Sequence, residues 1–126
     1  MLLGQSSEDY LETVLELEQL HGVVRSIDIA KKLGVSRPSV NKAINNLKEA
    51  GMVTQQSYGD IRLTVIGRQT AQEIIYRHML IKKFLITVLH LDPDIAETDA
   101  CKIEHILSPQ TIESLENFIM HYKENS

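Results

Sequence analysis

The chain of 126 residues contains a single cysteine, Cys101, which excludes a disulfide within the chain and fits a reducing compartment. No apolar run approaches the ~20 consecutive residues that cross a bilayer as a helix, so we expect no membrane contact and a cytoplasmic location. Hydrophobic residues make up 43% and charged residues 24% of the sequence, as in ordinary globular proteins. A chain of this length can form one compact core or two small lobes.

Motifs that carry out catalysis are also missing. The sequence has no His-Glu-x-x-His zinc motif, no nucleophile elbow and no glycine-rich phosphate loop. These absences predict that the protein is not an enzyme. A thiol-based redox sensor is disfavoured as well, because Cys101 has no second cysteine with which to react.

The formal net charge of −4 is unevenly distributed. Residues 25–50 contain six basic and two acidic residues, whereas the rest of the chain contains seven basic and fifteen acidic ones. For DNA binding, such a local basic patch matters more than the total charge. The charge pattern therefore favours a nucleic-acid-binding face on an otherwise acidic protein.

The first part of the chain reads as a series of capped helices. Ser6 or Ser7 is expected to cap the first helix, and Gly22 to end it. Ser26 is expected to cap a short second helix that ends at Gly34. Helical spacing predicts that this second helix turns three residues toward the core: Ile27, Ala30 and Leu33.

A third helix follows the turn at Gly34. Ser36 is placed to cap it, with Pro38 in the first turn, where its missing N–H costs nothing. Its predicted buried stripe consists of Val40, Ile44 and Leu47. Two short helices joined by a glycine turn, the second polar on its outer face, are typical of a helix-turn-helix, although an ordinary solvated helical hairpin is the alternative.

A β-hairpin is predicted directly behind these helices. The runs 52–56 and 61–64 flank a turn that contains Gly59, which indicates the wing of a winged helix. Arginine and asparagine side chains suit base edges in the major groove, and serine or lysine suits phosphate. The candidate DNA-binding residues are Arg25, Ser36, Arg37, Pro38, Ser39, Asn41, Lys42, Asn45, Asn46 and Arg62.

The second half of the chain is predicted to be helical. A long helix should run from about residue 64 to residue 89, another should open at Pro93 and carry residues 97–105, and Ser108-Pro109 should start the last. These helices are too few to bury all their apolar stripes, so they indicate a dimerisation lobe. The predicted fold is mainly α: a winged-helix DNA-binding domain (1–64) and a helical metal-binding and dimerisation domain (65–126).

Cys101, Glu104 and His105 have the spacing that places side chains on one face of a helix. A thiolate, a carboxylate and an imidazole together suit a divalent transition metal, although a buried cysteine beside a surface Glu-His pair is the alternative. Asp9 and Glu12, three apart in the first helix, could add carboxylates, or could simply form a solvated acidic turn.

Taken together, the segments 7–12, 76–78 and 101–108, with the winged helix between the first two, resemble the diphtheria toxin repressor family of metal-dependent regulators. The resemblance covers almost the whole chain. The chain is most similar to the short manganese transport regulator branch, since no SH3-like third domain follows.

The resemblance implies a set of metal ligands. The manganese-regulator pattern matches this chain at Asp9, Glu12, His78, Glu104 and His105. Two positions depart from it. Cys101 stands where that branch has a glutamate. A cysteine at this position resembles the iron-responsive branch of the family. Lys82 stands where an acidic residue is usual, which puts a second metal in doubt, although Glu97 is an additional candidate ligand.

The resemblance further implies a homodimeric repressor of metal-ion homeostasis genes that binds a palindromic double-stranded DNA operator when loaded with Mn²⁺ or Fe²⁺. Carboxylates favour these hard ions, whereas Zn²⁺, Co²⁺ or Ni²⁺ can bind in vitro because raw affinity follows the Irving–Williams order. The alternative function is a winged-helix regulator that senses a ligand other than a metal.

Overall fold

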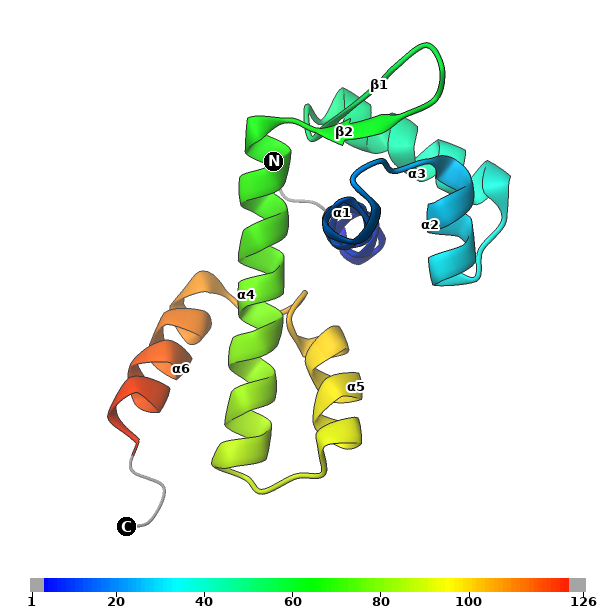
Figure 1. Ribbon diagram of the computed structural model, residues 1–126. Helices are drawn as coiled ribbons and strands as arrows, with labels where there is room; N and C mark the ends of the chain where they lie inside the picture. The colour runs from blue at the N-terminus through cyan, green and yellow to red at the C-terminus, as the bar shows by residue number, and fades with distance from the viewer. Residues whose placement is uncertain (1–3, 123–126) are drawn as a thin grey trace. The chain divides into compact units, whose positions relative to one another are not determined.

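The structure is a computed structural model that describes residues 4–122. The chain divides into two compact units, one up to Glu73 and one from Ile74 onward, and the division falls within a helix. Along the described residues, no helix is both long and apolar enough to cross a membrane. The elements are α1 (Gln5–His21), α2 (Ser26–Leu33), α3 (Arg37–Glu49), β1 (Val53–Gln55), β2 (Ile61–Leu63), α4 (Val65–Thr87), α5 (Pro93–Ile103) and α6 (Pro109–His121) (Figure 1).

Helix α1 supplies the centre of the first unit's core. Its buried side chains recur at helical spacing, because an amphipathic helix turns one stripe inward. Gly22 ends the helix at φ 79°, as predicted, in a region that favours glycine. The predicted serine cap is wrong, since the N-cap is Gly4, which makes no side-chain cap. The buried stripe of α1 consists of Tyr10, Leu11, Val14, Leu15 and Leu17.

Helices α2 and α3 form the predicted helix-turn-helix. Gly34 ends α2 in the left-handed conformation (φ 67°). Ser36 caps α3 by accepting a hydrogen bond from the Ser39 backbone N–H, with Pro38 in the first turn, as predicted. The predicted stripe of α3 is confirmed, because Val40, Ile44 and Leu47 are all buried.

The prediction for α2 is partly wrong. Ser26 is the first residue of the helix and not its cap. The N-cap is Arg25, whose backbone N–H donates to Asp28 Oδ2. Ile29 is fully buried, whereas Ile27 is exposed. The two isoleucines are two residues apart and lie on different faces of this eight-residue helix, and packing against α1 and α3 selects the face of Ile29.

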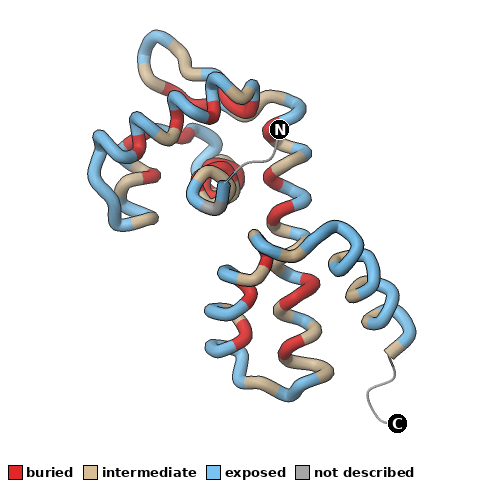
Figure 2. Tube along the Cα trace, turned by 180° about the vertical axis from the view of Figure 1, so that it is seen from behind, coloured by how far each residue is buried: buried red, intermediate tan, exposed pale blue. Residues whose placement is uncertain are grey.

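The hairpin behind α3 is the predicted wing. Strands β1 and β2 pair antiparallel, with Val53 opposite Leu63. The Ile61 N–H also donates to the Val24 carbonyl at 2.8 Å, which ties the first residue of β2 to the segment before α2. Figure 2 shows the buried residues of this unit gathered on the inner sides of its helices. In the loop between the strands, Ser57 and Tyr58 are exposed, whereas Asp60 is buried.

Thr64 and Gly67 fix the start of α4 in the first unit. The Thr64 hydroxyl accepts from the Gly67 N–H at 2.9 Å and donates to the Gly51 carbonyl at 2.7 Å. A Cβ at Gly67 would lie 1.8 Å from the Met52 carbonyl oxygen, so only glycine fits there. The backbone of α4 therefore approaches the start of β1 without an intervening side chain.

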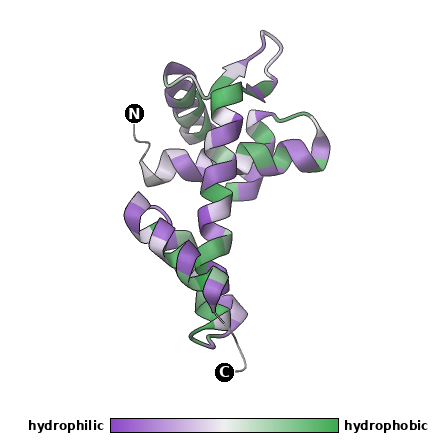
Figure 3. Ribbon diagram, turned by 90° about the vertical axis from the view of Figure 1, so that its left-hand side faces the viewer, coloured by the Kyte–Doolittle hydropathy of each residue, from purple (hydrophilic) through white to green (hydrophobic). Residues whose placement is uncertain are grey.

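The second unit is built from the C-terminal part of α4 with α5 and α6. Its buried centre is Ile81, Leu85, Ala96 and Ala100, surrounded by partly buried apolar residues. Figure 3 shows hydrophobic segments where the helices of this unit meet. Ala96 and Ala100 of α5 thus share one buried cluster with Ile81 and Leu85 of α4.

Helix α6 is held differently from α5. Ser108 caps it as predicted, but none of its residues is fully buried. Its contacts with α4 include the Phe84–Phe118 ring pair, with centroids 6.0 Å apart, and a hydrogen bond from the Tyr76 hydroxyl to Glu116. Met120 remains 72% exposed. In the single chain, α6 thus buries only part of its apolar surface.

Candidate metal centre and nucleic-acid interface

The helix-turn-helix presents its polar residues to solvent. All ten candidate DNA-binding residues are exposed (Arg25, Ser36, Arg37, Pro38, Ser39, Asn41, Lys42, Asn45, Asn46 and Arg62). Val40, Ile44 and Leu47 hold the opposite face of α3 in the core, so the polar face is fixed outward. The outer surface of α3 has the residue types that can contact DNA bases and phosphates.

Arg25 has a partner that the sequence does not reveal. Its Nε donates to Asp60 Oδ1 at 3.1 Å, and the Asp60 side chain is only 10% exposed. Asp60 precedes β2, so the ion pair connects the residue before α2 to the wing. The Arg25 side chain itself is 62% exposed, and the ion pair holds it in place beside the wing.

His78 lies between two carboxylates of the second unit. It projects from α4, with Nε2 2.9 Å from Glu97 Oε2 and Nδ1 3.3 Å from Glu104 Oε2. Both carboxylates come from the α5 segment, Glu97 within the helix and Glu104 at its C-cap. The imidazole is mostly buried, since 13% of its side chain is exposed. Packing of α5 on α4 thus brings together residues far apart in sequence.

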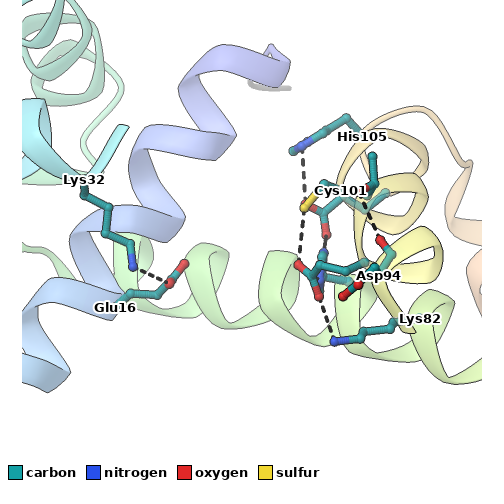
Figure 4. Close-up of polar contacts among 10 residues, drawn as sticks. Glu16, Lys32, Lys82, Asp94, Cys101 and His105 are labelled. Carbon is teal, nitrogen blue, oxygen red and sulfur yellow. Dashed lines mark hydrogen bonds and ion pairs between the residues drawn. The ribbon is translucent and has the colours of Figure 1, made fainter. Parts of the chain in front are cut away.

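Glu97 has two further neighbours. Lys82 Nζ lies 2.8 Å from Glu97 Oε1, and Cys101 Sγ lies 3.5 Å from Oε2. Figure 4 shows Lys82 and Cys101 extending toward this group from α4 and α5. Hydrogen bonds from Lys82 and, next, from His78 lower the pKa of Glu97 to about 2, because both neighbours stabilise its charged form.

Glu104 and His105 lie past the end of α5. The prediction that the helix carries them is wrong, because α5 ends at Ile103 and Glu104 is its C-cap. Glu104 is 2% exposed, so a charged group is held away from water. His105 Nε2 lies 3.3 Å from Glu104 Oε1. A buried carboxylate with an imidazole on either side is an arrangement in which a cation would be stabilised.

The donor atoms of this group fit a divalent transition metal. Ligand atoms of His78, Glu97 and Cys101 lie within 4.8 Å of one another, which is close enough for one ion to contact all three. They combine nitrogen, oxygen and sulfur, as borderline metal ions accept. Cys101 is exposed, which contradicts the alternative interpretation of it as a small hydrophobe packed in the core.

Asp9 and Glu12 belong to the first unit. Both lie in the first half of α1, and both are half-buried. The structure thus brings five candidate ligands together in the second unit (His78, Glu97, Cys101, Glu104 and His105) and places the other two in α1. Sequence reasoning missed the contact of Lys82 with Glu97. The i, i+4 spacing of His78 and Lys82 indicates that these two share one face of α4, but it does not indicate that Glu97 of α5 lies opposite them.

Comparisons with known proteins decide the family. The profile described as iron dependent repressor, N-terminal DNA binding domain, matches residues 2–61, and the profile described as iron dependent repressor, metal binding and dimerisation domain, matches residues 64–126. The chain belongs to the iron-dependent repressor family. The predicted family resemblance and mainly helical fold with a small hairpin are therefore confirmed.

Individual relatives agree with this family. The chain is 34% identical over 123 residues to an uncharacterized HTH-type transcriptional regulator of Methanocaldococcus jannaschii. The aligned region covers 97% of this chain and 98% of that relative. It is 35% identical over 111 residues to the transcriptional regulator MntR of Escherichia coli O6:H1, and this region covers 88% of this chain and 71% of that MntR. The structure of the manganese regulator SloR matches with a TM-score of 0.81 and 28% identity, over 98% of this chain and 56% of that one.

Family membership settles the class of protein. The chain is a metal-dependent DNA-binding transcriptional regulator and not an enzyme, as predicted. Its C-terminal part is a metal-binding and dimerisation domain. The chain spans about half the length of several solved relatives, such as 53% of the chain described as T. acidophilum IdeR.

Proposed function

We propose that the chain is a homodimeric repressor of metal-ion homeostasis genes that binds its operator when Mn²⁺ or Fe²⁺ is bound. The observation that carries this proposal is the position of His78, between Glu97 and Glu104, with His105 on the other side of Glu104. Two imidazoles around a buried carboxylate favour a divalent ion, and carboxylate oxygens favour the harder metals.

The proposed ligands come from both units. Asp9 and Glu12 of α1 would complete a set formed by His78, Cys101, Glu104 and His105, with Glu97 as the additional candidate. The bound ion would supply positive charge to a group of carboxylates. Mn²⁺ and Fe²⁺ are supported by the oxygen ligands, whereas Zn²⁺, Co²⁺ and Ni²⁺ are expected to bind in vitro. SloR is described as a manganese regulator, which agrees with the first choice.

The proposed mechanism uses this division of the ligands. Because α1 packs against α2 and α3, side chains on α1 are mechanically connected to the helix-turn-helix. Ligation by residues of α1 and of the second unit together would restrict how the two units move. In a dimer, this restriction would favour the spacing at which two α3 helices reach successive major grooves of a palindromic operator. The gain in DNA affinity is a coupling free energy, typically ~1–3 kcal/mol.

We also propose the boundaries of the two domains and the location of the protein in the cell. We place the DNA-binding domain at residues 1–64 and the metal-binding and dimerisation domain at residues 65–126. A regulator whose partner is genomic DNA, and whose one cysteine must stay reduced to bind metal, is expected in the cytoplasm and not at a membrane.

The test is metal-dependent DNA binding. Double-stranded DNA sites are selected in vitro with the Mn²⁺-loaded protein, and affinity for them is measured by fluorescence anisotropy, without oxygen, with Mn²⁺, with Fe²⁺ and with chelator. We expect affinity to rise about 5- to 150-fold with metal, the range of typical allosteric coupling. His78→Ala should abolish the rise while leaving the thermal unfolding curve of the metal-free protein similar.

Equal affinity with metal and with chelator would reject the metal switch and leave the regulator with another ligand. Glu113→Gln on α6 is a suitable control, since it removes an exposed carboxylate remote from His78 in sequence. Glu113→Gln should keep the metal response; if the response also survives His78→Ala, the proposed ligand set is wrong.

A further inference from the structure

Lys82 contacts a group of three possible metal ligands: His78, Glu97 and Cys101. We call this group the His78 cluster. Glu97 uses its two oxygens differently. Oε1 lies 2.8 Å from Lys82 Nζ, and Oε2 lies 2.9 Å from His78 Nε2. The three members of the cluster have ligand atoms within 4.8 Å of one another, which suits a metal ion. Yet the carboxylate of the cluster already has a cationic partner supplied by the protein.

The position of Lys82 follows from the sequence of α4. Lys82 is four residues after His78, so the two side chains emerge on the same face of the helix. Packing of α5 on this face places Glu97 opposite both of them. Lys82 is half-buried there, whereas Lys83, the next residue, is exposed. The ammonium is thus held at the cluster by the helix geometry.

A metal ion at Glu97 would have to displace this ammonium. If the lysine stayed, the ion and the ammonium would repel each other across one carboxylate. If the lysine moved away, the 2.8 Å contact would be lost. Either way, binding a cation at the cluster costs more than it would without Lys82. The site that remains for a metal is on the other side of the imidazole, where Nδ1 faces Glu104 at 3.3 Å.

We infer that Lys82 is the resident cation of the His78 cluster: it fixes Glu97 as the hydrogen-bond acceptor for His78 Nε2 and keeps a second metal ion from binding there. Glu97 is then a supporting residue and not a ligand. It orients His78 in the way that carboxylates orient metal-binding histidines in general. This inference rests on the proposed function for the activating ion, and it adds that a side chain supplies the positive charge at the His78 cluster.

The experiment counts bound ions. Equilibrium dialysis against Co²⁺ alone, followed by elemental analysis, gives the number of Co²⁺ ions per chain for the wild type, Lys82→Ala, Lys83→Ala and the double variant Lys82→Ala/Glu97→Ala, all handled without oxygen. We expect Lys82→Ala to bind one Co²⁺ per chain more than the wild type. Lys83→Ala, which removes the same charge from the neighbouring position, should match the wild type.

The double variant identifies the site of the gained ion. Because it removes the carboxylate of the cluster, its count should return to that of the wild type. An unchanged count in Lys82→Ala, or a gain that persists in the double variant, would overturn the inference. If Lys82→Ala unfolds, Lys82→Met, which keeps the length of the side chain, must show the same gain.

The proposed function and this inference are tested by different measurements. The function is tested by the DNA affinity of the wild type with metal and with chelator, whereas the inference is tested by a difference in ion count between variants in the absence of DNA. A wild type whose DNA affinity ignores metal would reject the repressor mechanism, and a gain of one ion in Lys82→Ala would still place the ammonium at a cation site.

Discussion

Gly67 is the residue at which backbone packing leaves no space for a side chain. A Cβ there would lie 1.8 Å from the Met52 carbonyl oxygen and 2.7 Å from its carbon. Both atoms belong to the backbone, so they cannot turn aside as a flexible side chain could. A substitution must therefore separate the start of α4 from the segment that leads into β1.

Gly67→Ala is expected to destabilise the protein. Overpacking of this kind typically costs about 1–3 kcal/mol, and the rigid backbone contact puts Gly67→Ala at the upper end. Urea unfolding followed by circular dichroism measures the loss in the free energy of unfolding. Gly4→Ala is the matched control, because a Cβ at Gly4 meets nothing within 4 Å. An equal stability of the two variants would show that the contact at Met52 relaxes freely.

For single residues, sequence patterns predict only part of the site. The spacing of Cys101, Glu104 and His105 identifies candidate ligands, since residues three and four apart share a helix face. The pairing of Lys82 with Glu97 is different. It joins two helices, and which residues meet depends on the packing of α5 against α4 around Ala96 and Ala100. No spacing within one helix carries that information.

Helix α3 is the element that we expect to contact DNA. Its polar face carries Lys42, which is exposed and lies on the basic segment of the chain. Since a lysine that contacts phosphate releases a counterion, the contact contributes to the salt dependence of binding without selecting a base sequence.

Lys42→Ala is expected to lower DNA affinity nearly equally for all sequences, and to reduce the slope of log affinity against log salt concentration by about one. Fluorescence anisotropy with the metal-loaded protein over a range of salt concentrations measures the slope. Lys102→Ala makes the same charge change on an exposed position of α5 and should leave the slope unchanged. Equal slopes for the two variants would show that Lys42 does not contact DNA phosphate.

Elements with strong local signals are predicted correctly, and those without them are not. Helix α3 has a serine cap, a proline in its first turn and three regularly spaced apolar residues, and all three features are confirmed. Helix α2 has two isoleucines two residues apart, which point to different faces, and only tertiary packing selects Ile29. Helix α5 ends at Ile103, with neither glycine nor proline beside that position to mark the end.

For the whole molecule, the incomplete burial of α6 bears on assembly. The family profile assigns dimerisation to the region that contains α6, and Met120 on that helix is exposed. We expect α6 to contribute to the dimer interface, because exposed apolar side chains in a dimerisation domain are buried by a second copy.

Met120→Glu is expected to weaken the dimer, since it would place a charge where apolar contact is expected. Sedimentation velocity over a range of protein concentrations measures the dissociation constant, which we expect to rise about 10-fold or more, the equivalent of at least ~1.4 kcal/mol. Ser114→Glu is the control, since it adds a charge at an exposed position six residues before Met120 and about 120° away around the helix axis. Equal dissociation constants for both variants would exclude Met120 from the interface.

Because α6 has no fully buried residue, part of its stability would come from the partner subunit. Folding of this helix and pairing of subunits would then be linked by mass action, so that dilution loosens α6 as well as separating the subunits. The amount of regulator in the cell would become an input to its response: at low abundance, the same metal concentration would leave fewer assembled dimers. The transcriptional threshold would depend on how strongly the gene for the regulator is itself expressed.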